Sequence, residues 1–251
     1  MKKPLLILSF FLLALTACKN EKKESEETAA NNTEEMSEQE VKEQDEWREL
    51  FNGENLEGWK AYNKEEISSQ WKVEDGAIVF IPSDEVEGNE NLITEEEFTN
   101  FELSIEWKIS EGGNSGIMWA VQEDEKYSEP YLTGPEIQIL DNEKHPDANN
   151  GLNRTAGALY DMVEPSEDVT KPAGEWNKEV IHIDHEENIG WVELNGTRIV
   201  EFPLHGEKWE EMVNNSKFKN WEGFGSSRSG HITLQDHGNK VWFRDIKIKE
   251  L

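Results

Sequence analysis

Alternation of apolar and polar residues, with a period of two, constrains the fold of this chain more than any other feature. In residues 101–109, FELSIEWKI, every odd-numbered position is apolar and every even-numbered position is polar. Successive side chains of a β-strand point to opposite faces, so this pattern places all the apolar residues on one face. The stretch therefore predicts a strand with one buried face.

Further short segments are predicted as strands, and turn residues lie between several of them. They are 71–74, 77–81, 115–122, 136–140, 158–163, 179–184, 189–194, 198–202, 231–235 and 241–248. The pairs Asp75-Gly76 and Asn195-Gly196 are typical of hairpin turns. Only residues 207–215 have a helical pattern. Many short strands with almost no helix predict an all-β fold of two stacked antiparallel sheets, a sandwich or jelly roll. The last strand is expected to pair near the first, because an unpaired terminal strand is an edge liability.

Length and charge bound the organisation of the chain and its partners. The chain has 251 residues, and we expect residues 47–251 to form one domain, because all-β domains of this size commonly stay undivided. It carries 25 Lys and Arg against 54 Asp and Glu, a net charge of −29. Nucleic-acid affinity comes chiefly from cationic contacts with phosphate, so this charge argues against nucleic acid as a partner. It favours solubility outside the cell.

The N-terminal segment predicts export and lipidation. Residues 1–17 resemble a signal peptide, with a positive start and an apolar stretch too short for a membrane span. Leu15-Thr16-Ala17-Cys18 fits the lipobox of bacterial lipoproteins, and Cys18, the only cysteine of the chain, is the predicted lipidation site. Residues 18–46 are polar and lack aromatic side chains, which predicts a disordered acidic tether. We expect a lipoprotein of the cell envelope in the outer membrane, facing either the periplasm or the cell surface. A plain signal peptide with an incidental cysteine is the alternative.

The stretch 134–150, GPEIQILDNEKHPDANN, is where we place the chemistry. Glu136 and Gln138 alternate with apolar residues and share the polar face of a strand. A β-bulge after Leu140 would return Asp141 to that face, and bulges often lie beside active sites. His145 follows just past the strand end. The alternative is an ordinary half-exposed strand that ends in an Asp-Asn turn.

A second polar stretch, HITLQDHG, lies near the C-terminus. Its apolar residues alternate with polar ones, so Gln235 faces away from the core, and Asp236 or His237 follows at the strand end. A histidine next to Gly238 suits a turn as well as a catalytic site. As a catalyst, His237 is the preferred acid and base, because an imidazole near its own pKa both takes and gives a proton.

Several motifs occur together and in order along the folded part. They are LFNGENLEGW, WKVEDGAI, GGNSGIMW, GPEIQILDN, AGALYDM, GEWN, LNG and GHITLQDHGNKVWFRDIKI. As a set, over residues 47–251, they resemble the 3-keto-disaccharide hydrolase family, which has lipoprotein members in Bacteroidetes. The ordered set carries the resemblance, since LNG or GEWN alone is near noise. It implies a concanavalin A-like jelly roll that acts on glycosides whose C3 hydroxyl has been oxidised to a ketone.

The resemblance also implies a two-step cleavage. The family's activity is described as 3-keto-glycoside 1,2-lyase and 3-keto-2-hydroxyglucal hydratase, which together amount to hydrolysis. A ketone at C3 makes the C2 hydrogen acidic, so a base removes it, the C1 aglycone leaves, and water then adds to C1. The implied partners are a 3-keto-glucoside or 3-keto-disaccharide substrate and an oxidoreductase that oxidises the sugar at C3.

Such a site needs a base near C2, an electrophile for the enolate oxygen and a proton donor for the leaving oxygen. In the matching motifs we expect three catalytic residues, Glu136, Asp141 and His237. We expect substrate contacts from Asn114, Trp119, Gln138, His145, Arg154, Tyr160 and Gln235. The alternatives are a turn role for Asn114 and a core position for Trp119.

No cofactor is certain from the sequence. A divalent cation held by carboxylates and histidine is an open alternative as the electrophile, although no ligand spacing is diagnostic. Many members of the family have an arginine soon after NSGI, where this chain has Ala120, so the role of that arginine is unfilled or moved.

Two other functions compete with this one. The stretch from Glu136 to Asp141 resembles the E-x-D-x-x-E signature of laminarinase-like retaining glucanases, but Gln138 replaces the middle Asp and Asp141 the distal Glu. Alternatively, the protein is a non-catalytic glycan-binding lipoprotein, which would suit its ten Trp residues. A binding module can do without Glu136, Asp141 and His237 converging in one pocket, whereas an elimination catalyst cannot.

Overall fold

The computed structural model describes residues 46–83 and 90–251. The contacts divide the chain into a unit of residues 1–45 and a unit of residues 46–251, and the second unit is described below. The predicted signal peptide (1–17), the lipidation site Cys18 and all but the last residue of the predicted tether (18–46) lie outside the described residues. None of the described helices is long and apolar enough to cross a bilayer.

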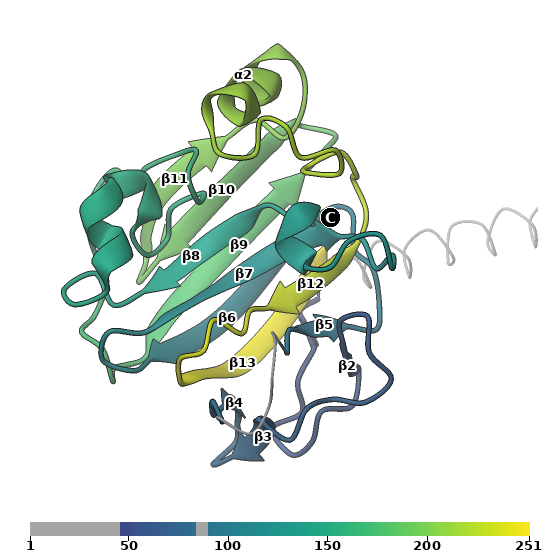
Figure 1. Ribbon diagram of the computed structural model, residues 1–251, viewed down its shortest axis with the longest axis vertical. Coiled ribbons are helices and arrows are strands. Elements are labelled where there is room, and N and C mark those ends of the chain that lie inside the picture. The colour runs from purple at the N-terminus through teal and green to yellow at the C-terminus, as the bar shows by residue number, and fades with distance from the viewer. Residues whose placement is uncertain (1–45, 84–89) are drawn as a thin grey trace, which may run out of the picture. The chain divides into compact units, whose positions relative to one another are not determined.

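Two antiparallel sheets form the described unit, which confirms the all-β jelly-roll sandwich (Figure 1). The larger sheet has the order β11-β10-β9-β6-β13-β4-β3, with β1 paired to β13. Its strands are β1 (Arg48–Glu49), β3 (Trp71–Glu74), β4 (Ala77–Phe80), β6 (Phe101–Ile109), β9 (Asn177–Asp184), β10 (Ile189–Leu194), β11 (Thr197–Phe202) and β13 (Val241–Glu250).

The smaller sheet has the order β2-β5-β12-β7-β8. Its strands are β2 (Trp59–Ala61), β5 (Leu92–Thr94), β7 (Asn114–Val121), β8 (Glu136–Leu140) and β12 (His231–Leu234). The described helices are the α-helix α2 (Glu207–Asn215) and three short 3-10 helices, η1 (Pro130–Leu132), η2 (Pro146–Asn150) and η3 (Leu152–Arg154). The helix α2 is where the sequence predicts it.

Local turn chemistry accounts for the hairpins that the sequence predicts. The turn between β3 and β4 has Asp75 at φ 51° and Gly76 at φ 74°, and the turn between β10 and β11 has Asn195 at φ 51° and Gly196 at φ 86°. Two consecutive left-handed residues define the tight turn whose twist matches antiparallel strands. The expected pairing of the last strand with the first is also confirmed, since Arg48 lies opposite Ile248.

Two local predictions are wrong. Residues 158–163 are not a strand: Leu159 makes isolated bridges, the amides of Met162 and Val163 both bond to its carbonyl, and Asp161 has φ 59°. The bulge expected after Leu140 is absent, because the register of β8 with β7 is continuous from Glu136 to Leu140 and the next amide, that of Asp141, still donates to the Gly113 carbonyl at 3.0 Å. A register shift occurs instead between β7 and β12, where Ala120 adopts φ 53°.

The two faces of the smaller sheet serve different purposes. Its inner face contributes Ile117, Trp119 and Ile137 to the core shared with the larger sheet, and the Trp119 ring stacks on Phe202 of β11 at 5.8 Å. The alternation of strand side chains turns Glu136, Gln138 and Asn114 to the other face. The sandwich is therefore held together from one side of this sheet, and the other side is left for a polar site.

Candidate functional site

A pocket of about 520 Å³ opens on the outer face of the smaller sheet. Its walls come from β7, β8, the segment after β12, and the loops that carry η1 and follow α2. The lining residues are Asn91, Asn114, Tyr131, Glu136, Gln138, Tyr160, Lys217, Trp221, Gln235, Asp236, His237 and Gly238. The structure thus brings Glu136, Gln235 and His237 together, as the interpretation of the two polar stretches requires.

The floor of the pocket follows from the pairing of β7 with β8. Gly116 lies opposite Gln138, and Met118 lies opposite Glu136. A Cβ atom at residue 116 would overlap the carboxyl group of Glu136, so glycine at this position makes room for it. The carbonyl of Gly116 also accepts a hydrogen bond from the backbone amide of Gln235 at 3.0 Å, which joins the segment after β12 to β7.

Both protonation states of the Glu136 carboxyl are accessible near neutral pH. Only 7% of the residue is exposed. Burial raises the pKa of Glu136 to about 7, and the negative charge of Asp147 acts in the same direction, while Lys217 and a hydrogen bond with Gln235 oppose the rise. A carboxyl with this pKa takes up and releases a proton near neutral pH, as a general base or acid must.

Three amide oxygens in the pocket lack partners in the part of the chain that the structure describes. They are Oδ1 of Asn114, Oε1 of Gln138 and Oε1 of Gln235, all of them buried. Buried acceptors without a hydrogen bond cost roughly 1–3 kcal/mol each. Because all three belong to residues that line one pocket, they fit a ligand that carries several hydroxyl donors.

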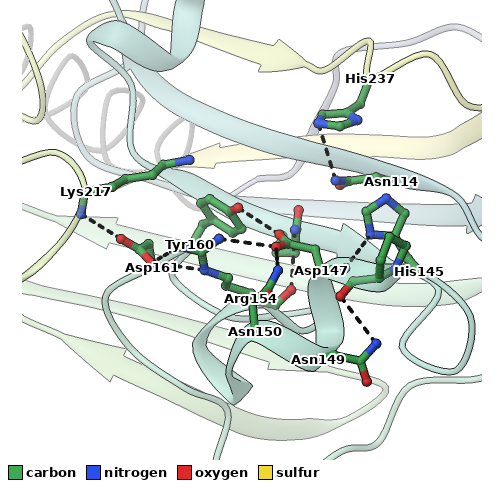
Figure 2. A network of polar contacts seen from close by, with 12 residues as sticks. Asn114, His145, Asp147, Asn149, Asn150, Arg154, Tyr160, Asp161, Lys217 and His237 are labelled. Carbon is green, nitrogen blue, oxygen red and sulfur yellow. Dashed lines mark hydrogen bonds and ion pairs between the residues drawn. The ribbon is translucent and has the colours of Figure 1, made fainter.

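Two histidines lie near each other, but only His237 is among the described lining residues, and the predicted site residue His145 is not. Nε2 of His237 lies 3.5 Å from Nδ2 of Asn114, and its ring centroid is 6.3 Å from that of His145 (Figure 2). His145 Nδ1 accepts a hydrogen bond from the Asp147 amide at 3.2 Å, so a neutral His145 carries its proton on Nε2. Burial and the charge of His237 lower the pKa of His145, which favours that neutral form.

Arg154 links two carboxylates behind the pocket (Figure 2). Its Nη1 donates to Asp147 Oδ1 at 3.2 Å, and its Nη2 donates to Asp161 Oδ1 at 2.8 Å. The Tyr160 hydroxyl donates to Asp147 Oδ2 at 2.8 Å, and burial together with this bond raises the pKa of Tyr160. The guanidinium of Arg154 is thus occupied by protein carboxylates, and Arg154 does not line the pocket. We call Asp147, Arg154 and Asp161 the carboxylate clasp.

Lys217 is the cation of the pocket, and sequence patterns do not point to it. It is the only lysine or arginine among the described lining residues. Its side chain is exposed at the rim with Nζ 4.2 Å from the centre of the Tyr160 ring, and its backbone amide donates to Asp161 Oδ2 at 2.7 Å. Partial loss of hydration lowers the pKa of Lys217 although Glu136 and Asp161 attract its charge.

Three more lining residues are not among the candidates predicted from the sequence: Asn91, Tyr131 and Trp221. They lie in loops or in segments without a periodic pattern, and only the tertiary fold brings them to the pocket. Asp236 does follow a predicted strand, but both of its carboxylate oxygens accept backbone amides, from Gly238 at 2.7 Å and Glu90 at 2.9 Å.

Asp141 and Trp119 need correction as site residues. Without the expected bulge, Asp141 follows the end of the strand and binds two loops, with Oδ2 accepting from the Gly112 amide of the β6–β7 turn at 2.7 Å and Oδ1 accepting from the Glu143 amide of its own loop at 3.1 Å. Trp119 does not line the pocket, because it packs in the core against Phe202. Asp141 does not line it either, so the expected convergence of Glu136, Asp141 and His237 is met by Glu136 and His237 and not by Asp141. Trp119 therefore takes its alternative position, as a core residue.

The described residues contain no group of three or more His, Cys, Asp or Glu side chains arranged to hold a metal ion. The described pocket residues therefore do not fit a dedicated metal centre.

Comparison with known proteins gives a consistent picture. The model of a family described as "3-keto-alpha-glucoside-1,2-lyase-like domain" matches residues 46–249. A protein of Bacteroides thetaiotaomicron named 3-keto-disaccharide hydrolase is 35% identical over 234 residues, covering 80% of this chain and 77% of that protein.

Two crystal structures from Parabacteroides distasonis, of proteins provisionally assigned as glycosyl hydrolases, share the fold. The first has a TM-score of 0.76 and 32% identity and covers 82% of this chain and 94% of its own. The second has a TM-score of 0.62 and 27% identity and covers 82% of this chain and 100% of its own.

Proposed function

Because the chain belongs to the family of 3-keto-alpha-glucoside-1,2-lyase-like domains, we propose that it cleaves 3-keto-glycosides, with 3-keto-disaccharides as the main substrate class. The observation that carries the proposal is the buried carboxyl of Glu136, with a pKa of about 7, beside three amide oxygens that have no hydrogen-bond partner among the described residues. The first feature supplies a base at neutral pH, and the second supplies acceptors for sugar hydroxyls.

The proposed reaction has two stages. Glu136 removes the proton from C2, which the C3 ketone has made acidic, and the electron pair forms an enolate. The enolate then expels the C1 oxygen, which takes a proton as it leaves with the aglycone. Water adds to C1 of the resulting 3-keto-2-hydroxyglucal and C2 regains a proton, so the net change is hydrolysis.

The other pocket residues meet the remaining needs of this reaction. The Lys217 ammonium is the electrophile for the enolate oxygen, since a cation stabilises the negative charge that develops there. His237, which lines the pocket, is the donor for the leaving oxygen, and His145 lies beside it with a ring centroid 6.3 Å away. Asn114, Gln138 and Gln235 accept hydrogen bonds from the hydroxyls of the keto ring.

Among the described residues, a retaining glucanase mechanism finds no second free carboxyl in the pocket. Such enzymes use two carboxyl groups about 5–5.5 Å apart, one as nucleophile and one as acid and base. Asp141 lies outside the pocket, and both oxygens of Asp236 are held by backbone amides. Glu136, the one free carboxyl among the described lining residues, suits elimination from a substrate that a ketone has already activated.

The test is to incubate the purified domain with a 3-keto-glucoside and, separately, with the parent glucoside. We expect release of the aglycone from the keto compound only, with the 2-hydroxyglucal as a transient species by NMR. Release from both substrates would point to a direct glycosidase. Binding without release from either would point to a glycan-binding protein, and both outcomes would overturn the proposal.

We further propose that the protein is a lipoprotein of the cell envelope, lipidated at Cys18, and that an oxidoreductase supplies its substrate by oxidising C3. The lipobox and the C3 ketone required by the proposed reaction support these two points. Labelling cells with a fatty-acid analogue tests the first, and we expect Cys18→Ser to abolish incorporation. Incorporation that survives this substitution would contradict it.

A further inference from the structure

One end of the pocket holds the base and the cation of the proposed reaction. Glu136 lies opposite Met118 in the pairing of β8 with β7. The backbone amide of Tyr160 donates to the Glu136 carbonyl at 3.0 Å, and the Lys217 ammonium lies 4.2 Å from the centre of the Tyr160 ring (Figure 2). The atoms C2 and C3 of the keto ring are therefore expected at this end.

The two histidines lie at the other end of the same strands. Asn114 begins β7, four positions from Met118 and so about 13 Å away at the rise of a β-strand. His237 Nε2 is 3.5 Å from the side-chain nitrogen of Asn114, and the His145 ring lies 6.3 Å from the ring of His237 (Figure 2). The proposed donor for the leaving oxygen and His145 are thus neighbours, far from the lysine.

Backbone hydrogen bonds hold His145 on both sides. Its amide donates to the Asp141 carbonyl at 3.0 Å, and its Nδ1 accepts from the Asp147 amide at 3.2 Å. The proton of the neutral ring is then on Nε2, which has no hydrogen-bond partner among the described residues and is not one of the buried unpartnered atoms. Since the residue is only half-buried, this N–H group can donate to a ligand.

We propose that His145 donates a hydrogen bond from Nε2 to a hydroxyl of the leaving sugar, and that it thereby favours saccharide aglycones over alkyl and aryl ones. This inference rests on the proposed function, which puts C3 at Lys217, C2 at Glu136 and the C1 oxygen at His237. These groups follow the strands in the order of the substrate atoms, so the aglycone extends beyond His237. There it meets His145, which lies outside the lining of the pocket that takes the keto ring.

Two other roles of His145 make different demands on the substrate. A proton donor for the leaving oxygen matters most for a poor leaving group such as methanol and least for phenol. A purely structural role, as the residue that caps η2, affects every substrate alike. A hydrogen bond to the aglycone affects only substrates whose aglycone carries hydroxyl groups. A set of three substrates therefore separates the three roles.

The test compares the 3-keto forms of a disaccharide, a methyl glucoside and a phenyl glucoside. His145→Asn keeps an acceptor for the Asp147 amide, since asparagine is a good N-cap residue, but it removes the Nε2 donor. We expect kcat/KM to fall about 3- to 10-fold for the disaccharide, the range of one neutral hydrogen bond, and to change little for the other two. His182→Asn, on the larger sheet, is the matched control and should leave all three values as they are.

The outcomes separate this inference from the proposed function. An equal loss on all three substrates would assign His145 to holding its loop. A loss on the disaccharide and the methyl glucoside, with little loss on the phenyl glucoside, would assign it to acid catalysis. Either result, or unchanged rates on all three, would overturn the contact with the leaving sugar while the reaction stands. If the unaltered protein releases no aglycone from any of the three, the proposed function fails, and the inference fails with it.

Discussion

At the scale of single residues, the proposed reaction depends most on Glu136. Its carboxyl occupies the space that Gly116 leaves free and is almost completely buried. For Glu136→Gln, which keeps the shape of the side chain, we expect kcat on a 3-keto-glycoside to fall about 10²- to 10⁴-fold, the range of a lost general base. Substrate affinity measured by calorimetry should change far less. A variant that keeps most of its kcat would exclude Glu136 as the base.

The pH dependence of the reaction follows from the same carboxyl. A base must be ionised to act, and the pKa of Glu136 is about 7. We therefore expect kcat/KM to rise as pH increases through about 7 and to level off above it. The measurement is a pH profile with a 3-keto-glycoside, from which Glu136→Gln should remove the rise. A profile that is level across neutral pH would contradict this assignment.

Lys217 is the second residue whose chemistry is open to test. For Lys217→Met we expect kcat to fall about 10²- to 10³-fold, as when one donor to a developing oxyanion is lost. Lys219→Met removes an exposed lysine two residues away and serves as the matched control. Equal rates for the two variants would exclude Lys217 as the electrophile. A covalent adduct trapped by borohydride would show that Lys217 reacts with the ketone instead of stabilising the enolate by its charge.

At the scale of the elements, the carboxylate clasp joins the floor of the pocket to the segment after α2. Asp161 accepts from both Arg154 and the backbone amide of Lys217, at 2.8 and 2.7 Å. For Asp161→Asn, which tolerates the left-handed backbone, we expect faster amide hydrogen exchange at residues 217–218 and roughly a tenfold loss of kcat/KM, since a charge-assisted hydrogen bond is worth about 1.5–3 kcal/mol.

The control for the clasp is Glu201→Gln, an exposed carboxyl on β11. Faster exchange confined to the segment around Lys217 would support a positioning role for Asp161. Exchange at that segment that matches the unaltered protein would contradict it, even if activity is lost.

The sequence predicts well those elements whose structure is set by residues close together in the chain. The hairpin at Asp75-Gly76 and the strand β6 follow from turn chemistry and a period of two, both readable within about ten residues. The bulge expected after Leu140 is absent, and the structure has a register shift between β7 and β12 instead. The position of that shift depends on how β7 pairs with a strand more than a hundred residues away in the chain, so local patterns do not reveal it. Asp161 ends the expected strand at 158–163 because its left-handed backbone and its bonds to Arg154 and Lys217 come from the tertiary fold.

The residues of the site also fall into two groups, those that can be predicted from their own strands and those that only the tertiary fold places. Alternation places Glu136 and Gln138 on one face, and Gln235 away from the core, so these pocket residues could be predicted from their own strands. Lys217 and Trp221 could not, since they belong to irregular segments whose position is set by packing against Phe218 and by the clasp. Arg154 and Asp141 have residue types that suit catalysis, but their side chains are taken up by protein partners.

At the scale of the whole molecule, two buried carboxyls make stability depend on pH. Glu179 on β9 is fully buried; its Oε2 accepts from Trp107 Nε1 at 2.5 Å, and its Oε1 has no partner among the described residues. Burial raises the pKa of Glu179 to about 8. Since its folded-state pKa is raised, its contribution to stability is complete below its unfolded pKa and is lost as pH rises through about 8. Glu136 acts with the same sign.

We therefore expect the free energy of unfolding to fall between pH 5 and pH 7, with Glu179 contributing about 1.4 kcal/mol per pH unit. Glu179→Gln should remove that part of the slope, as measured by urea denaturation at the two pH values. Glu201→Gln should leave the slope as it is. A slope unchanged by Glu179→Gln would show that this carboxyl is already ionised in the folded state.

The walls of the main pocket are contributed by residues from Asn91 to Gly238, with β7 and β8 between them in the chain. No shorter piece of the polypeptide contains the complete set. A chain cut short before Gly238 therefore lacks part of the pocket wall, and we expect such a product to release no aglycone from a 3-keto-glycoside.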